Sequence, residues 1–442
     1  MSKNGYTFKL SHIQTLSTQM TNTFALLCFF MHLLAYANLL GYYETTMQID
    51  ELEFINCQNV LNAIERDLFE PSRAQIAKHV GLSRTASSLI ANKLINAELI
   101  KELDKKTKGI GRPGTPLVID DTSWHAIGAT FYSGAWVFVI VNLLGNIFKT
   151  HHVSVFSTEQ DVLTEKLIEG LEYMRSICPK KMLPGFGIGA PGLVDHVSGS
   201  VLRADDLGWK EILPLKTIVE QRTGLPVFII NRYRANGLAE IRYGNHKKFP
   251  NIIYIGIGTG IAGSIYLDNK LLNTTNYRIG HIVIDPHGPL CGCGQKGCLQ
   301  AMASEGALLM FARSQLEKNP AFLSKTHGKT LTGKLIAKLA LDGDPDARLC
   351  LEHISAPLAI GVSTLANVIA PNEIIIGGPI GDASTYLVDC VRKRVKEYLL
   401  DWQNEEIIIS QGTQGKYGSA IGAATFMLEH KLELVMDGYC HD

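Results

Sequence analysis

The feature that most constrains the fold of this 442-residue chain is a strand pattern that occurs twice after residue 124. The first copy opens with "HAIGATFY", "AWVFVIVNLLG" and "NIFKTHHVSVF", which predict three strands joined by tight turns. A helix over Val162–Ser176 follows, and then a strand that runs into "GFGIGAPGLVD". The second copy opens with "NIIYIGIGTGIAGSIYLDNKLL" and continues through helices to the strand "NEIIIGGPIG". This recurrence predicts a duplicated α/β architecture of two lobes with a cleft between them.

Glycines follow two strands of the second copy, in Gly258-Thr259-Gly260 and in Gly377-Gly378. Their backbone freedom lets main-chain amides approach a phosphate. Glycine-rich loops of this kind are common, so they only support the interpretation of the cleft as a binding site.

The region before the duplicated part predicts a helix-turn-helix. Apolar residues recur at helical spacing from Asn59 onward: Val60, Leu61, Ile64 and Leu68. Ser72 and Gln75 predict a capping box, Gly81 predicts a helix stop, and Ser83 predicts the cap of the next helix. The inward face of that second helix is expected to carry Leu89, Ile90, Leu94 and Ile95. In a helix-turn-helix the second helix enters the major groove of DNA. An ordinary helical hairpin with a solvated polar face is the alternative.

The polar side of the second helix supplies candidate contacts to phosphates and base edges. These are Ser83, Arg84, Thr85, Ser87, Ser88, Asn92 and Lys93. Strands over Leu99–Leu103 and Thr115–Ile119 flank a basic turn and resemble a wing, to which Lys105, Lys106 and Arg112 would add phosphate and minor-groove contacts. A flexible linker is the alternative for this stretch. The formal net charge is zero, so any contact with DNA must come from such a local patch.

One imidazole and three thiols predict a metal site. His281, Cys291, Cys293 and Cys298 form a closed tetrahedral set for a structural zinc ion, with His287 as a substitute for His281. The chain has nine cysteines, an odd number, and the other six are scattered. This usage indicates a reducing compartment rather than a disulfide framework. Reduced cysteines without metal are the alternative.

The N-terminus carries an uncharged apolar stretch, Phe24–Tyr43, that is long enough to span a bilayer and that also resembles a signal peptide. Lysines precede it and acidic residues follow it, so insertion would export everything downstream. A DNA-binding module could not act there. We therefore expect residues 1–46 to be a dispensable extension, with Met47 as a plausible natural start, although a membrane segment remains the alternative.

Several motifs together resemble the ROK family (repressors, open reading frames and kinases), and in particular its transcriptional repressors. They are the cysteine run, "GAPGLVD", "GTGIAG", "YGSAIGAA" and the wing ending in "GRPGTP", and the resemblance spans Asn56 to Leu428. It implies a winged helix-turn-helix over residues 47–120 fused to an actin-like domain, a duplicated ribonuclease H-like fold, over residues 121–442. It further implies a cytoplasmic homodimer or tetramer that binds operator DNA of carbohydrate-related genes. Small ligands or a regulatory protein partner modulate such binding in the family.

Three departures from the family pattern argue against sugar phosphorylation. In the kinases of the family a catalytic aspartate follows the asparagine that aligns with Asn231, and here that position is Arg232. Two glutamates that bond sugar hydroxyls align with Arg278 and Gln300. The first phosphate loop contains Thr130, Tyr132 and Ser133 in place of the usual aspartate and glycines. A guanidinium cannot act as a general base at neutral pH, so we expect no kinase activity. A sugar kinase or a non-catalytic scaffold protein is the alternative.

The same departures suggest the chemistry of a ligand. The resemblance places Asn231, Arg232, Arg278, His281 and Gln300 in the ligand site. Because arginine only donates hydrogen bonds, such a site favours an anion such as a sugar phosphate or a sugar acid over a neutral sugar. The alternative is that the arginines pair with Asp205, Asp206 or Glu240 and close the pocket.

Overall fold

The computed structural model describes residues 51–67, 69–103, 114–132, 134–244, 249–272, 278–318, 330–399 and 406–436. The apolar segment Phe24–Tyr43, residue Leu68, the wing residues Lys105, Lys106 and Arg112, and Ser133 lie outside these ranges. Contacts divide the chain into two compact units, Met1–Asn96 with Glu102–Val118, and Ala97–Lys101 with Ile119–Asp442. The division crosses two short strands, β1 (Ile100–Glu102) and β2 (Leu117–Ile119), which pair in a sheet of their own.

The first unit is a small helical domain with the predicted helix boundaries. Helical residues 51–62 and the π-helical turn η1 (Ala63–Asp67) are followed by α3 (Arg73–Val80) and α4 (Arg84–Asn96). The capping box is confirmed, because Gln75 Oε1 accepts the backbone N–H of Ser72 at 2.9 Å. Gly81 ends α3 with φ at +73°, and Ser83 Oγ accepts the N–H of Ala86 at 3.1 Å. The predicted helix, glycine turn and helix are therefore present.

The inward face of α4 differs from the prediction at Leu89 and Ser87, and Ile95, which was also expected inside, is only partly buried. Leu89 was expected inside and is 62 % exposed, whereas Ser87 was expected outside and is fully buried. The buried positions of α4 are Ser87, Ile90, Ala91 and Leu94, a single stripe at helical spacing. Ser87 fits inside because α3 passes close by, and its hydroxyl donates to the carbonyl oxygen of Arg73 at 3.1 Å. Leu89 falls on the opposite side of the helix.

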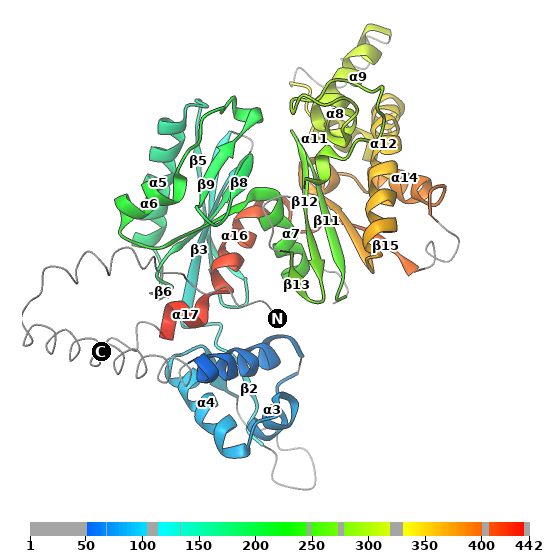
Figure 1. Ribbon diagram of the computed structural model, residues 1–442. Helices are drawn as coiled ribbons and strands as arrows, with labels where there is room; N and C mark the ends of the chain where they lie inside the picture. The colour runs from blue at the N-terminus through cyan, green and yellow to red at the C-terminus, as the bar shows by residue number, and fades with distance from the viewer. Residues whose placement is uncertain are drawn as a thin grey trace, which may run out of the picture. The chain divides into compact units, whose positions relative to one another are not determined.

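The second unit contains two sheets of the same plan, each covered by helices (Figure 1). In the first lobe β3 (Trp124–Tyr132), β4 (Ala135–Asn142) and β5 (Ile147–Ser154) form an antiparallel meander. On the other side of β3 lie the parallel strands β7 (Phe186–Ala190) and β10 (Val227–Asn231), and the short β6 (Lys181–Met182) also pairs with β3. The sheet order is therefore β10-β7-β3-β4-β5.

The second lobe repeats this order as β15-β14-β11-β12-β13. Strands β11 (Ile252–Ile257), β12 (Ile261–Leu267) and β13 (Lys270–Leu271) are antiparallel, and β14 (Glu373–Gly377) and β15 (Ile408–Gln411) continue in parallel. The predicted duplication is thus confirmed, strand for strand. The described helices of the two lobes include α5 (Gln160–Ser176), α6 (Leu215–Thr223), α8 (Leu299–Ala303), α9 (Glu305–Lys318), α11 (Gly333–Leu341), α13 (Gly378–Gly381), α14 (Thr385–Val395) and α17 (Lys431–Met436).

Two helices join the lobes. Helices α7 (Arg232–Tyr243) and α16 (Gly418–Leu428) run between the two sheets (Figure 1). At their crossing, a Cβ on Gly422 would lie 1.6 Å from the carbonyl oxygen of Ala235. Only glycine permits this approach, so Gly422 fixes the distance between the two helix backbones.

Each joining helix packs on one sheet through glycines as well. A Cβ on Gly128 or Gly187 of the first sheet would lie 2.1 Å from a carbonyl oxygen of α16. On the other side, a Cβ on Gly237 of α7 would lie 1.9 Å from Ser264 Oγ of β12. Glycines therefore bring each joining helix into close contact with its sheet.

One described helix, α12 (Pro345–Ile369), is long and apolar enough to cross a membrane by length and composition alone. It is buried along most of its length, and Leu351, Ile354 and Leu358 are in the centre of the second-lobe core. We interpret it as the central helix of that core.

Candidate functional site

A cavity of about 480 Å³ lies between the lobes. The first lobe contributes β8 (Leu193–Asp195), the end of β9 (Ser200–Arg203), the turn η2 (Asp205–Leu207) and the start of α7. The second lobe contributes the β11–β12 turn, η3 (Ile279–His281) and the start of α8. All five residues assigned to the ligand site by resemblance line this cavity: Asn231, Arg232, Arg278, His281 and Gln300.

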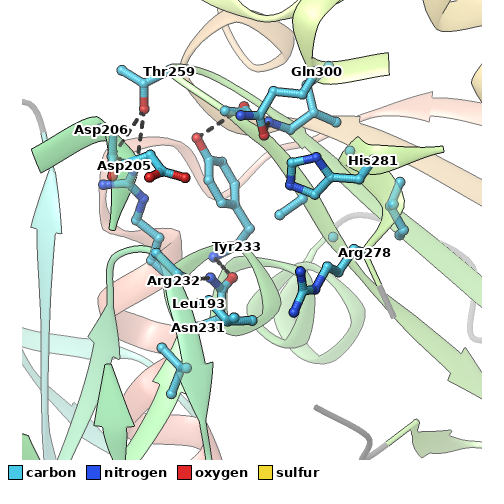
Figure 2. A pocket seen from close by; sticks show the side chains of 18 of the residues that line it. Leu193, Asp205, Asp206, Asn231, Arg232, Tyr233, Thr259, Arg278, His281 and Gln300 are labelled. Atoms are coloured by element: carbon cyan, nitrogen blue, oxygen red, sulfur yellow. Dashed lines mark hydrogen bonds and ion pairs between the residues drawn. The ribbon is translucent and has the colours of Figure 1, made fainter. Parts of the chain in front are cut away.

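Arg232 connects the two lobes across one side of the cavity (Figure 2). Its Nη2 donates to Asp206 Oδ2 at 2.6 Å and to Thr259 Oγ1 at 3.1 Å, and its Nη1 donates to the carbonyl oxygen of Phe131 at 3.4 Å. Asp206 belongs to the first lobe, whereas Thr259 lies in the β11–β12 turn of the second. The guanidinium is largely buried, so these bonds form in a medium that screens charge less than water.

Asn231 holds the start of α7. Its Oδ1 accepts the backbone N–H groups of Tyr233 and Arg234, at 2.9 and 3.2 Å, as an N-cap. Its Nδ2 donates to the carbonyl oxygen of Gly192 at 2.7 Å. In this arrangement Asn231 fixes where α7 begins and thereby orients Arg232.

The opposite side of the cavity is formed by Arg278, His281 and Gln300 (Figure 2). Gln300 Oε1 accepts the backbone N–H of Ile261 at 3.1 Å, which holds this side chain against the β11–β12 hairpin. Arg278 is exposed, and no acidic side chain in the described part of the chain pairs with it. This side therefore presents a guanidinium to an incoming ligand.

The charges that line the cavity are mostly positive. Four arginines and two aspartates are present: Arg203, Arg232, Arg234, Arg278, Asp205 and Asp206. Asp206 pairs with Arg232, and Asp205 Oδ1 accepts from Arg203 at 2.5 Å. Glu240 is fully buried and accepts the N–H groups of Thr413 and Gln414, at 2.6 and 2.7 Å. The alternative of arginines paired with local acids therefore holds for Arg232, which pairs with Asp206, but none of these acids pairs with Arg278.

The predicted metal ligands lie together. The ligand atoms of His281, Cys291, Cys293 and Cys298 are all within 4.8 Å of one another. His281 Nδ1 is 3.6 Å from Cys291 Sγ, and Cys293 Sγ is 3.6 Å from Cys298 Sγ. His287, the substitute ligand, is exposed and not part of this group.

The electrostatics of this cluster suit a cation. Burial lowers the pKa of His281, and the nearby Arg278 guanidinium lowers it further, so the imidazole is kept neutral as a ligand must be. Burial, together with the neighbouring sulfurs of Cys293 and Cys291, raises the pKa of Cys298 to about 12. Thiols this close resist forming several thiolates at once unless a cation offsets their charge. The donor set fits a metal ion.

The candidate DNA contacts fall into four groups. Ser83, just before α4, is exposed, and Arg84, Thr85 and Ser88 are exposed or partly exposed on α4. Asn92 accepts from Arg73 Nη2 at 2.8 Å, and Lys93 pairs with Glu53, so both are engaged within the domain. Ser87 is buried and cannot reach DNA in this structure. Lys105, Lys106 and Arg112 lie outside the described residues.

Sequence reasoning missed three features of these sites. Arg203 gave no signal, because nothing in its neighbourhood marks the β8–β9 hairpin as part of a cleft. Thr259 was noted only as part of a glycine turn. Leu89 was assigned to the core, although the spacing of Ile90, Ala91 and Leu94 would have placed it outside.

The fold and the site define a winged-helix domain joined to a two-lobed, sugar-kinase-like domain with a metal-ligand cluster beside its cleft. The model of the ROK family matches residues 132–430, and the chain belongs to this family.

The chain is 26 % identical over 383 residues to the DNA-binding transcriptional repressor Mlc of Escherichia coli. That alignment covers 85 % of this chain and 93 % of the repressor. It is 31 % identical over 303 residues to a glucokinase of Streptomyces coelicolor, with 66 % of this chain and 93 % of the enzyme covered. A crystal structure of a ROK family transcriptional regulator, a homologue of the E. coli MLC protein, superposes with a TM-score of 0.74 at 26 % identity and covers 87 % of this chain and 98 % of the other.

We predict that Arg232 and Asp206 are coupled in stability. In a double-mutant cycle of Arg232→Ala and Asp206→Asn, the coupling in free energy of unfolding should be about 1–3 kcal/mol, because a charged hydrogen bond in a largely buried site is lost. Urea unfolding of the four proteins measures it. The exposed pair of Arg222 and Glu165 is the matched control and should show a smaller coupling. Equal coupling for the two pairs would contradict the prediction.

Proposed function

We propose that this protein is a sequence-specific DNA-binding transcriptional repressor of carbohydrate-related genes. In this proposal residues 47–120 bind the operator, residues 121–442 sense a ligand and form the oligomer, and residues 1–46 are dispensable. The observation that carries the proposal is the presence, in one chain, of a winged helix and a kinase-like cleft whose Arg232 is paired with Asp206. In this proposal the protein is a homodimer or tetramer in the cytoplasm, and two of its DNA-binding domains bind the two half-sites of a two-fold symmetric operator.

Sugar phosphorylation is the second candidate, because glucokinases of the family match the same lobes. Phosphoryl transfer to a hydroxyl needs a group that accepts its proton. The position that the resemblance assigns to that group is Arg232, which cannot accept a proton at neutral pH. A coupled assay with ATP and a panel of sugars should therefore show no turnover above background. Turnover that Asp206→Asn abolishes would favour the kinase.

The lobes supply a mechanism for regulation. The cleft can adopt more open and more closed conformations. A ligand that binds one of these conformations more tightly shifts the population toward it. Arg232 reaches from the first lobe to Thr259 of the second, so a ligand that competes for its donors changes how the lobes are held. Operator affinity would follow if the two lobe arrangements space the DNA-binding domains differently.

We predict that Arg84→Ala weakens operator binding about ten-fold or more, because Arg84 is exposed at the start of the proposed recognition helix. Genome-wide mapping of bound DNA first defines the operator, and fluorescence anisotropy then measures affinity. Arg222→Ala, an exposed arginine of α6, is the control and should leave binding unchanged.

Lys105→Ala with Lys106→Ala should mainly flatten the salt dependence of operator binding. The absence of any mapped DNA site would contradict the proposed function.

We further propose that the cluster of His281 and three cysteines holds one structural zinc ion. A tetrahedral ion with Zn–S bonds of about 2.3 Å separates its sulfurs by about 3.8 Å. Here Cys293 Sγ is 3.6 Å from Cys298 Sγ, and His281 Nδ1 is 3.6 Å from Cys291 Sγ. All four positions are supplied by protein, so the ion would stabilise the loop rather than bind substrate.

Native protein should contain one zinc per chain, and Cys291→Ser with Cys293→Ser should remove it and lower the thermal midpoint by several degrees. Plasma mass spectrometry and thermal melting measure the two effects. Cys178→Ser with Cys390→Ser changes two cysteines outside the cluster and should keep the metal. Native protein without zinc would rule out the site.

We also propose that the cavity binds a small anion such as a sugar phosphate or a sugar acid. Support comes from the excess of arginine along its walls and from Arg278, which pairs with none of the acids described there. Arg232 is already occupied by Asp206, so Arg278 is the guanidinium most ready to bind. The family resemblance also implies a regulatory protein partner, and this is a separate proposal from the small anion.

Calorimetry against paired neutral and phosphorylated sugars should show binding of the anionic member only. Arg278→Ala should weaken that binding about ten-fold or more, because a charge-assisted bond is lost. Arg175→Ala, an exposed arginine on α5, is the control. Tight binding of a neutral hexose that Arg278→Ala leaves unchanged would contradict the proposed ligand class.

A further inference from the structure

The first turns of α4 present four side chains that the protein itself does not use. Arg84, Thr85 and Ser88 have no side-chain hydrogen bond or ion pair within the described residues, and Leu89 is 62 % exposed. The polar residues farther along are different, since Asn92 bonds Arg73 and Lys93 pairs with Glu53. The unused surface of α4 is therefore confined to its N-terminal half.

This surface is continuous. Residues three and four apart are neighbours on a helix, so Leu89 lies next to Thr85 and, through the next turn, next to Asn92. Arg84 and Ser88 form the adjacent row. Leu89 is thus an apolar side chain in the middle of a polar surface, while the buried stripe of the same helix runs through Ile90 and Leu94.

The proposed function gives this surface a partner, because the N-terminal half of a recognition helix faces base edges in the major groove. Base edges in that groove offer hydrogen-bonding groups and a single apolar group, the 5-methyl of thymine. Leucine neither donates nor accepts a hydrogen bond. Opposite a cytosine it would cover the amino group without replacing its bond to water, and this costs free energy.

We propose that Leu89 is a specificity-determining residue that reads one thymine of each operator half-site through its 5-methyl group. The inference rests on the proposed DNA binding and refines it. Arg84, five residues before Leu89 on the same helix, is placed to read a guanine of the same half-site. Replacement of this thymine by uracil removes one methyl group and leaves every hydrogen-bonding group in place.

The experiment uses the full-length protein and the duplex that it selects from a random library. Each thymine of that duplex is replaced in turn by deoxyuridine, and affinity is measured by anisotropy. At one position per half-site, wild-type protein should bind the uracil duplex about four-fold more weakly, the ratio that corresponds to about 0.8 kcal/mol for one buried methyl. Leu89→Ala should bind the thymine and uracil duplexes equally at that position.

Controls separate this outcome from its alternatives. Leu52→Ala removes a leucine of equal exposure, 61 %, from another helix and should keep the four-fold ratio. Leu89→Met keeps an apolar side chain and should keep most of it. The inference is overturned if wild type discriminates at no position, or if Leu89→Ala keeps the full ratio. It is also overturned if Leu89→Ala changes the oligomeric state by light scattering, since Leu89 would then serve a protein contact. If no duplex is selected at all, the proposed function itself fails.

Discussion

The contact on which the two-lobed domain depends is the crossing of α7 and α16. At Gly422 the two backbones approach so closely that a Cβ would lie 1.6 Å from the carbonyl oxygen of Ala235. Glu240, at the far end of α7, accepts the N–H groups of Thr413 and Gln414, just before α16 begins. The same two helices pack on opposite sheets, so their crossing sets where the lobes lie and therefore the shape of the cavity between them.

This arrangement determines the surroundings of Arg232 in the cleft. Helix α7 begins directly after Asn231, so its first residue, Arg232, is delivered into the cavity wall. The N-terminus of a helix carries partial positive charge, which favours a carboxylate there and disfavours a guanidinium. The aspartate that the family resemblance implies for kinases would gain from this field, whereas Arg232 is opposed by it. Asp206, at 2.6 Å, supplies the compensating charge. The Arg232 guanidinium is thus stabilised by its ion pair with Asp206. It stays protonated at neutral pH and does not act as a base.

Local patterns predicted much of this structure, and non-local contacts account for the rest. The caps at Ser72 and Ser83 depend on residues three positions away, and the strand duplication depends on alternating apolar runs, so both could be read from sequence. The cysteine spacing identified the metal-ligand group for the same reason. The pairing of Arg232 with Asp206 and the burial of Ser87 depend on segments far apart in the chain or on how closely two helices approach. The prediction for Leu89 was wrong because Leu89 and Ile90 are adjacent and point in different directions on the helix. Both are apolar, so their hydrophobicity does not indicate which of the two faces the core.

The metal-ligand loop and the ligand cavity share residues, and this connects the two sites. His281 stands at the start of the loop and Gln300 just after its end, and both line the cavity. Backbone bonds already close the loop near its base, since Leu299 N–H donates to the Ile282 carbonyl and Ile284 N–H to the Gly297 carbonyl, each at 2.9 Å. A metal ion would therefore add to a formed hairpin and restrict mainly its tip and the imidazole of His281. Gln300 also accepts the backbone N–H of Ile261, so the residue that follows the loop is connected to β12 of the second sheet. The cluster is best understood as part of the cavity wall, with its stability contributing to how well the cavity is preorganised for a ligand.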